Sequence, residues 1–549
     1  MNKQLIRLFL ILVIGNTAFA EISNYSYRMN GLGKELLDFT NDEYSDIYYN
    51  PYYINKIEGI RIFSNLSNLN GAMPTNFAET DINLLRNTLY PTNLIGGIGN
   101  WKGNKVGVIY SSSGFAIKLR NEHTSSSVYN GLNLNTGSGD FETKGVLGGR
   151  DINLFYGNQN YSFLLKFSTF SSGIMSTDND ESVEYTATGQ TESKWTEKDE
   201  YGMMNNTYVM GISAGKVEKL EQSEISKSVG IEPAFLNVSI KDVSNYLNQY
   251  FELNDINGYK NDYNNSESIS VSGWSAFGRY REQSFLNETI TFSRVLKLSA
   301  NWVPFSWTSK NYELYENWDT GWGDEFFRHT YNESKQKNEI SGNAFIISTT
   351  GGYGFELNFP ESITKLILGA KVKYFFVYFN GNDAPDVTEN TYYRVYPNAS
   401  NDDDDYGYES TLNNNKSIEL AGQSHIISLN FPIGVETKLS KKLNLRLGAN
   451  TLLPLFGHGN IKYSEEDEPN SNYTRITHGP DKGEINQQTN DSPTYKSSDK
   501  FSITSSNANL SSYNFGLGWE INQNLHLDIL HFSKLTDLGT WWFSLGIKF

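Results

Sequence analysis

The chain has 549 residues, a formal net charge of −17 and no cysteine. Hydrophobic residues make up only 38% of it, whereas aromatic residues reach 14% and there are 35 Tyr and 47 Gly. Because no apolar run after the N-terminus reaches a length of about 18 residues, the sequence argues against a helical membrane protein. The acidic balance argues against a nucleic-acid partner, since phosphate binding needs clustered Lys and Arg.

Residues 1–20 have the pattern of a cleaved signal peptide. Lys3 belongs to a basic region, 8–14 (LFLILVI) form an apolar one, and AFA at 18–20 fits the small-x-small rule for cleavage before Glu21. We therefore expect an exported protein. Small exported domains often carry disulfides, so the lack of cysteine in this large chain indicates a fold that is stabilised by other means.

The segment 21–56 precedes the first predicted strand. Within it, 29–54 read MNGLGKELLDFTNDEYSDIYYNPYYI, with a Gly-bearing start, a short amphipathic piece, an acidic turn and the motif DIYYNP. This order resembles the start of the long-chain fatty-acid transporter (FadL-like) family and its PorV-like relatives. The resemblance implies an outer-membrane barrel of about 14 strands in which the segment forms a hatch. Asp46, Asn50 and Pro51 would then be hatch residues.

From residue 57 on, apolar and polar residues alternate in many stretches. Ile427, Leu429 and Phe431, for example, alternate with Ser428 and Asn430. A period of two predicts a strand with one apolar and one polar face. The stretches are 58–66, 105–111, 114–120, 149–157, 161–170, 207–215, 268–281, 288–302, 343–357, 364–379, 424–439, 442–453, 511–520 and 540–549. They predict an all-β transmembrane antiparallel barrel of about 14 strands, within a range of 12 to 16, over residues 57–549.

The connections between the predicted strands differ in length on the two sides. Lys441-Lys442 and 522–524 are short polar turns, whereas 381–423 and 455–507 are long and rich in Asn, Asp, Ser and Tyr. Counting crossings back from the last strand places every long connection on one side. Short periplasmic turns and long extracellular loops are typical of outer-membrane barrels, so we expect the two long stretches to be extracellular loops.

Residues 216–266 interrupt the alternation. Their apolar residues recur at helical i, i+3, i+4 spacing, as in Val243, Tyr246, Leu247 and Tyr250. This spacing predicts a loop insertion with an amphipathic helix of about three turns. The insertion would be either a lid over the barrel mouth or a loop that packs its own small core, and the second is favoured.

The chain ends in TWWFSLGIKF, with a bulky apolar residue at every second position. These residues are Trp541, Phe543, Leu545, Ile547 and Phe549. The pattern resembles the C-terminal signature of bacterial outer-membrane proteins, which implies that the barrel-assembly machinery reads it as an assembly signal. We expect this strand to close the barrel against the first one, because an unpaired sheet edge is costly in hydrocarbon.

Charged residues on the predicted inner faces form the candidate lumen site. The inward cations are Lys118, Arg120, Lys166, Lys371, Lys373 and Arg446. The hatch carboxylates are Asp38, Asp42, Glu43 and Asp46, while Glu356, Glu436 and Glu520 lie near the periplasmic ends of strands. Such charges cost little in a wet lumen and would be expensive facing lipid. The cations would either bind an anionic head group or pair with the hatch carboxylates, and pairing is favoured as the more economical account.

His526 and Asp528 lie two residues apart on one inward face, where the carboxylate could orient the imidazole. No nucleophile elbow accompanies them, so we expect a polar lumen pair and no enzymatic role. The acidic run 402–405, with Asp383 and Asp386, could bind Ca²⁺, but its spacing is not that of an EF-hand and a solvated loop is favoured. We therefore predict no catalytic residues, no cofactor and no metal.

Two functions fit these features. The first is passive transport of small hydrophobic compounds across the bacterial outer membrane, with the hatch as gate and Ile367, Phe375 and Val377 along the path. The second is a non-transporting surface protein whose long loops contact a host, a matrix or a secretion partner. Outer-membrane lipid and the barrel-assembly machinery are expected partners in both cases, and hydrophobic small molecules in the first.

Overall fold

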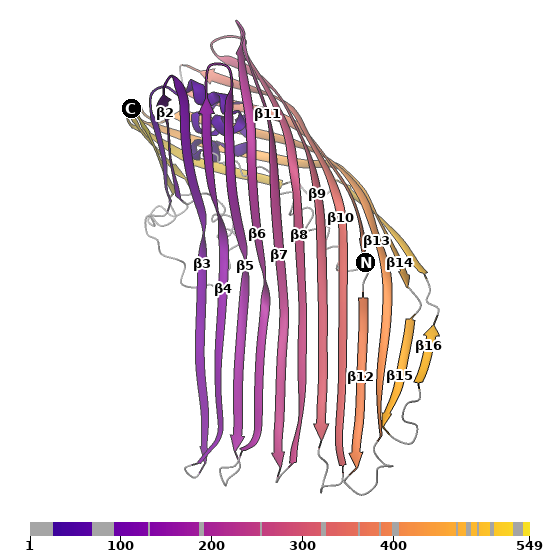
Figure 1. Ribbon diagram of the computed structural model, residues 1–549. Coiled ribbons are helices and arrows are strands. Elements are labelled where there is room, and N and C mark those ends of the chain that lie inside the picture. Colours follow the sequence, from indigo (N-terminus) through magenta and orange to yellow (C-terminus); the bar gives the residue numbers. More distant parts are fainter. Residues whose placement is uncertain are drawn as a thin grey trace.

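In the computed structural model, the described strands form one antiparallel sheet of 20 strands (Figure 1). The described residues are 26–67, 93–129, 132–185, 191–252, 255–319, 326–360, 363–383, 386–397, 406–467, 470–478, 485–490, 494–504, 510–530 and 542–549. The predicted signal peptide, the acidic run 402–405 and Trp541 lie outside them.

The strands differ widely in length, from six to 34 residues. They are β1 (Arg61–Ser67), β2 (Asn93–Trp101), β3 (Asn104–Tyr129), β4 (Leu132–Gly157), β5 (Ser162–Tyr185), β6 (Thr191–Lys219), β7 (Ser223–Glu252), β8 (Asp255–Phe285), β9 (Ile290–Asp319), β10 (Phe326–Phe359), β11 (Thr364–Asp383), β12 (Asp386–Pro397), β13 (Tyr406–Lys438), β14 (Leu443–Asp467), β15 (Asn470–His478), β16 (Ile485–Asn490), β17 (Thr494–Thr504), β18 (Leu510–Asn522), β19 (Leu525–Leu530) and β20 (Trp542–Lys548).

The sheet closes into a barrel, which confirms the predicted all-β antiparallel barrel. β1 pairs with β2 on one side and with β20 on the other. β12 continues the line of β11 beside β10, and β15 continues the line of β14 beside β13. In the same way β16, β17 and β18 follow one line beside β15 and β14. The closed wall therefore has 16 strands rather than 14.

The difference in strand number has a local cause. The predicted strands 105–111 and 114–120 are one strand, β3, and three further strands, β2, β7 and β19, are not among the predicted stretches. The helix predicted within 216–266 is wrong, because β7 pairs with β6 and β8 along nearly its whole length. Tyr246 and Tyr250 are four residues apart and therefore also share one face of a strand, so their spacing fits either structure.

The outer face of the wall carries two rows of aromatic side chains. In the first row Trp274, Trp302, Phe345 and Tyr378 are cross-strand neighbours on β8 to β11, and they are 43%, 41%, 37% and 43% exposed. Phe355 marks the second row, ten residues from Phe345 on β10, or about 33 Å at roughly 3.3 Å per residue. A strand tilt of about 40° reduces this to about 25 Å, the height of the lipid-facing band in outer-membrane barrels.

Beyond the first row, the strands continue away from the short turns. β10 runs another 19 residues, from Phe345 to Phe326, or roughly 60 Å of strand. We call the part of β3 to β17 beyond this row the extension (Figure 1). The described residues of 381–423 and 455–507 are strands that lie mainly in the extension, so the prediction that these stretches are loops is wrong. Their polar composition suits a sheet that has water on both faces.

The N-terminal segment, 26–57, contains four short helices. They are α2 (Tyr27–Leu32), η1 (Lys34–Asp38), α3 (Glu43–Tyr49) and η2 (Pro51–Lys56). The Asp42 carboxylate caps α3 by accepting a hydrogen bond from Ser45 N at 2.8 Å. Asn50 caps η2 and is followed by Pro51 at the first helical position. No helix among the described residues is long and apolar enough to cross a membrane.

The N-terminal segment lies inside the barrel, near its short-turn end (Figure 1). α2 contacts β13, β14, β18 and β19, whereas η2 contacts β3 to β6 across the interior. The segment therefore touches opposite parts of the wall. Four of its apolar side chains, Met29, Leu32, Leu36 and Ile47, are completely buried.

Candidate functional site

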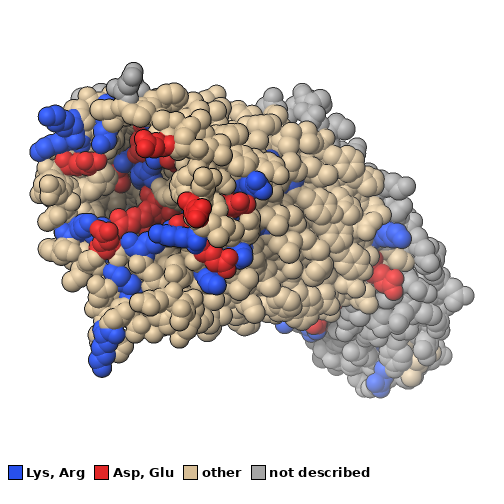
Figure 2. Space-filling model, turned by 90° about the horizontal axis from the view of Figure 1, so that it is seen from above, with Lys and Arg blue, Asp and Glu red and all other residues tan. Residues whose placement is uncertain are grey.

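The candidate site is the contact between the N-terminal segment and the inner face of the wall. Figure 2 looks onto the end of the barrel that holds the segment, where Lys, Arg, Asp and Glu surround a hollow opening. Most described side chains of the segment are buried. Charged groups removed from water in this way need partners on the wall.

Phe39 occupies a socket formed by two glycines. Gly354 on β10 and Gly369 on β11 are direct cross-strand neighbours, and Phe39 is 0% exposed. A Cβ atom on Gly369 would lie 2.1 Å from the Phe39 ring, and one on Gly354 would lie 2.4 Å from it. Any larger residue at either position would collide with the ring. The wall and the segment are therefore matched in shape at this point.

Asp38 attaches the segment to β9 and β11. Its carboxylate lies 2.6 Å from Lys297 Nζ and 2.9 Å from Lys371 Nζ. Lys371 also pairs with Glu35, and Lys373 Nζ lies 3.2 Å from Glu35 Oε1. Burial alone would raise the pKa of Glu35, but Lys371 and Lys373 lower it to about 2. Burial acts on Asp38 in the same way, yet Lys297 and Lys371 hold its pKa far below the usual range.

Arg281, on β8, joins three parts of the segment. The side chain is completely buried, and its guanidinium lies 3.0 Å from Asp46 Oδ1. It donates a hydrogen bond to the carbonyl oxygen of Leu37 at 3.0 Å and another to the Tyr53 hydroxyl at 2.7 Å. Burial raises the pKa of Tyr53 to about 12 although the cation opposes this, so the phenol stays neutral. One buried cation thus holds η1, α3 and η2 to the same strand.

Asn50 fixes the other half of the segment to β6 and β7. Its Nδ2 donates hydrogen bonds to Ser226 Oγ at 2.7 Å and to the carbonyl oxygens of Lys216 and Lys227 at 3.1 Å each. Gly215 leaves the space for this amide, since a Cβ atom there would lie 1.7 Å from Asn50 Oδ1. Pro51 follows and is buried. Asn50 therefore caps a helix and bridges two wall strands.

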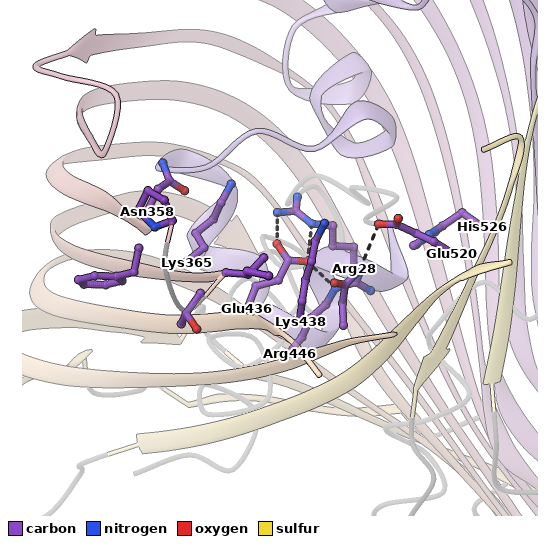
Figure 3. Close-up of a pocket in the computed structure, with 13 residues that line it drawn as sticks. Arg28, Asn358, Lys365, Glu436, Lys438, Arg446, Glu520 and His526 are labelled. Carbon is purple, nitrogen blue, oxygen red and sulfur yellow. Dashed lines mark hydrogen bonds and ion pairs between the residues drawn. The ribbon is translucent and has the colours of Figure 1, made fainter. Parts of the chain in front are cut away.

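A chain of ion pairs runs from Arg28 of the segment to β19, and Figure 3 shows its first links, from Arg28 through Glu436 to Arg446. Arg28 donates two hydrogen bonds to Glu436, at 3.1 and 2.7 Å. Glu436 also accepts one from Arg446 at 2.7 Å, and Arg446 pairs with Asp528. Asp528 Oδ1 lies 2.8 Å from His526 Nε2. The chain borders a pocket of about 460 Å³ that opens at the short-turn end.

The ion pairs suit attachment better than chemistry. Glu436 is shared by two guanidinium groups, and Asp528 is shared by Arg446 and His526. In the part of the chain that the structure describes, no group of three or more His, Cys, Asp or Glu is placed to hold a metal ion.

A second pocket, of about 430 Å³, separates Asn41 to Tyr44 from β18 to β20.

An apolar layer lines the inner face of β6 to β11 beyond the segment. Ile367 packs against the segment, and Val377, ten residues further along β11, belongs to the layer. Phe375 packs against it. Its other buried members are Val209, Ala234, Leu236, Val238, Ile269, Val271, Val303, Phe305, Trp307, Ala344, Ile346 and Phe379. The three predicted path residues therefore lie at the segment or in the layer.

The structure brings most sequence-predicted site residues to the segment. Asp46, Asn50 and Pro51 belong to the segment itself. The wall residues that pair with the segment or lie in its chain of ion pairs are Lys371, Lys373, Arg446, His526 and Asp528. Lys166 instead lies 3.6 Å from Glu232, and the side chains of Lys118 and Arg120 are outside the described part. Arg281 was missed, although the alternation places it on the inner face of a predicted strand.

The last strand closes the wall. Phe543, Leu545 and Ile547 belong to β20, which pairs with β1 and β19. Phe549 extends this seam: its N–H donates a hydrogen bond to the Ile60 carbonyl at 3.0 Å, and its carbonyl accepts one from Ile60 at 3.2 Å. The final residue therefore remains tied to the residue that precedes β1.

No family model and no curated protein matches the chain. Among solved structures it is similar to the copper transporter OprC, with 8% identity over 77% of this chain and 81% of that chain, at a TM-score of 0.18. A TM-score this low does not show a shared fold. The closed barrel is established by its own strand pairing.

Proposed function

We propose that the protein is an outer-membrane barrel through which small apolar compounds pass, with the N-terminal segment as its hatch. The apolar layer is the observation that carries the proposal. Water-filled barrels have polar interiors, whereas Leu236, Phe305 and Val377 belong to a continuous apolar surface on the inner face. Such a surface favours an apolar ligand by roughly 25 cal/mol for each Å² removed from water.

The position of the segment supports its role as a hatch. It lies between the apolar layer and the short-turn opening, and it is attached to separate parts of the wall, to Arg281 on β8 and, through Arg28, to Glu436 on β13. A compound that leaves the apolar layer toward the short turns has to pass the segment. The sequence resemblance to FadL-like proteins, in which this part of the chain is a hatch, supports the same role.

The aromatic rows support a location in the outer membrane. Their separation of about 25 Å along the barrel axis equals the lipid-facing height of such barrels. The side chains between them include Leu296 and Val372, which are 51% and 48% exposed and would be costly in water as part of one apolar belt. The short turns would then face the periplasm and the extension the outside.

Uptake into liposomes tests the transport function. Protein reconstituted in sealed vesicles should admit an apolar aromatic probe such as naphthalene carbinol faster than a sugar of similar mass. Val303→Asn and Phe305→Asn, which make the apolar layer polar, should slow uptake of the probe. Ser306→Asn, on the opposite face of β9, is the matched control. Uptake equal to that of protein-free vesicles would refute transport.

The extension favours a second candidate function, that of a surface protein. Roughly 60 Å of strand beyond the aromatic row exposes a large polar sheet outside the membrane. A strain that lacks the protein, takes up apolar compounds at an unchanged rate and no longer attaches to host cells or matrix would support this function. Slower uptake with normal attachment would support transport.

A further inference from the structure

The two faces of the extension differ in charge. On β5 to β9, every Lys of the extension lies on the outer face: Lys194, Lys198, Lys241, Lys260 and Lys310. Carboxylates on that face accompany them, with Lys194 3.1 Å from Glu181 and Lys260 2.6 Å from Asp262. The outer face is therefore close to neutral.

The inner face of the same strands is acidic. Its carboxylates are Asp178, Asp180, Glu184, Glu197, Asp199, Asp242, Glu267 and Glu313, and the described inner positions hold no Lys or Arg. Asp178 lies directly opposite Asp199, and Asp180 directly opposite Glu197. Like charges at opposed positions destabilise a sheet. Asp199 Oδ1 is buried and accepts no hydrogen bond from the described residues.

Aromatic and apolar side chains share this inner face. The rings of Trp195 and Tyr246 lie 6.0 Å apart, and the ring of Tyr259 stacks on Tyr246 at 5.3 Å. Ile174 and Met203, which are cross-strand neighbours, are 59% and 49% exposed between the carboxylates and the apolar layer. Ring faces attract cations, and exposed aliphatic groups attract the apolar part of a ligand.

We propose that the inner face of the extension selects apolar cations, such as aromatic or alkyl ammonium ions, for the path below it. This inference rests on the proposed transport function and names its substrate class. The carboxylates attract the cation from solution, the rings of Trp195 and Tyr246 hold its charged end, and Ile174 and Met203 guide its apolar part toward the layer. Anions of the same size are repelled.

A pair of charge-matched variants tests the selection. The inner variant carries Asp178→Asn, Asp180→Asn, Glu197→Gln and Asp199→Asn. The outer variant carries Glu142→Gln, Glu181→Gln, Glu200→Gln and Asp262→Asn, so both change the net charge by the same amount. Binding of phenyltrimethylammonium, benzoate and benzyl alcohol is measured by equilibrium dialysis at low and high salt, together with uptake into liposomes. Equal heat-modifiable migration on gels shows that both variants are folded.

The wild type and the outer variant should bind the ammonium ion about tenfold more tightly than benzoate at low salt, and high salt should reduce this ratio. The inner variant, which keeps the other inner carboxylates and the rings, should lose most of this preference, with binding of benzyl alcohol unchanged. Equal binding of cation and anion by the wild type, or equal losses in both variants, would overturn the inference. A wild type that shows the preference in dialysis but admits no probe into liposomes would instead refute transport alone.

Discussion

Replacing Phe39 by Ala should release the N-terminal segment from the wall. The ring is completely buried between Gly354 and Gly369, and nothing in that socket can close over the space it leaves without moving two paired strands. Removing a buried Phe side chain costs about 3 to 5 kcal/mol. Since each 1.4 kcal/mol is a factor of ten, the undocked fraction of the segment should rise by about a hundredfold to a few thousandfold.

A single introduced cysteine can report this change, because the chain contains none. Ser45→Cys places a thiol in the segment at a position that is 1% exposed. Its rate of reaction with a maleimide measures how often the segment opens. Phe39→Ala should raise that rate by the factor given above. Tyr52→Ala removes a half-buried ring from the same segment and should raise it far less.

Gly369→Ala provides the refuting test. Its new methyl group would lie 2.1 Å from the Phe39 ring and should therefore expel the segment as well. In a chain that already carries Phe39→Ala, the methyl group meets empty space, so the second change should add little to the labelling rate. Additive effects of the two changes, or a rate for Phe39→Ala equal to that of Tyr52→Ala, would show that the socket does not hold the segment.

Three further outcomes are expected. Arg281→Met leaves Asp46 buried without its cation, which should cost about 3 to 5 kcal/mol of stability. The barrel should therefore unfold at a lower temperature when samples are heated before gel electrophoresis, and Asp46→Asn in the same chain should restore part of the lost unfolding temperature. The pKa of Glu35 is lowered from 4.5 to about 2 by Lys371, so its stabilising effect is complete above pH 4.5 and is lost as the pH falls toward 2. The rate at which pepsin cleaves the segment, divided by its rate on an unfolded substrate, should therefore rise as the pH falls from 4.5 to 2. A ratio that does not change with pH would contradict the pairing of Glu35 with Lys371. Deletion of Phe549 removes both hydrogen bonds to Ile60 and, if the last strand is the assembly signal, should reduce the amount of folded barrel in the outer membrane without changing export; normal insertion would disprove this role.

The sequence predicts the barrel well wherever one face of a strand carries exposed apolar side chains and the other is buried. Val372 was expected on the outer face and Lys371 on the inner one, and they are 48% and 1% exposed. The alternation works here because an apolar outer face and a charged inner face beside the N-terminal segment impose opposite demands on neighbouring residues. The position of a charged residue on the inner face is therefore readable from the sequence, but its partner is not. Arg281 and Asp46 are 235 positions apart, and only the strand register and the path of the segment bring them together.

The extension could not be predicted in the same way. Its strands have water on both faces, so β7 shows no strong alternation of apolar and polar residues beyond Val243, and the stretches 381–423 and 455–507 have the composition of loops. Backbone pairing with long neighbouring strands decides the structure there. The predicted number of strands was also too low, because β2 is short and rich in glycine and shows too little alternation to be recognised as a strand.

The constant register in which β7 pairs with β6 and β8 limits how this wall can change in length. Neither pairing contains a register shift, so the side chains of β7 that face inward near the short turns keep alternating with outward-facing ones in the same order through the extension. Deleting one residue near Val238 would turn Lys241 inward and Asp242 outward, and every residue up to the tip would exchange sides. Deleting two adjacent residues would shorten the strand and leave each side chain on its own side. Hairpins of this barrel can therefore grow or shrink only by even numbers of residues per strand if the inside and the outside are to keep their separate chemistry.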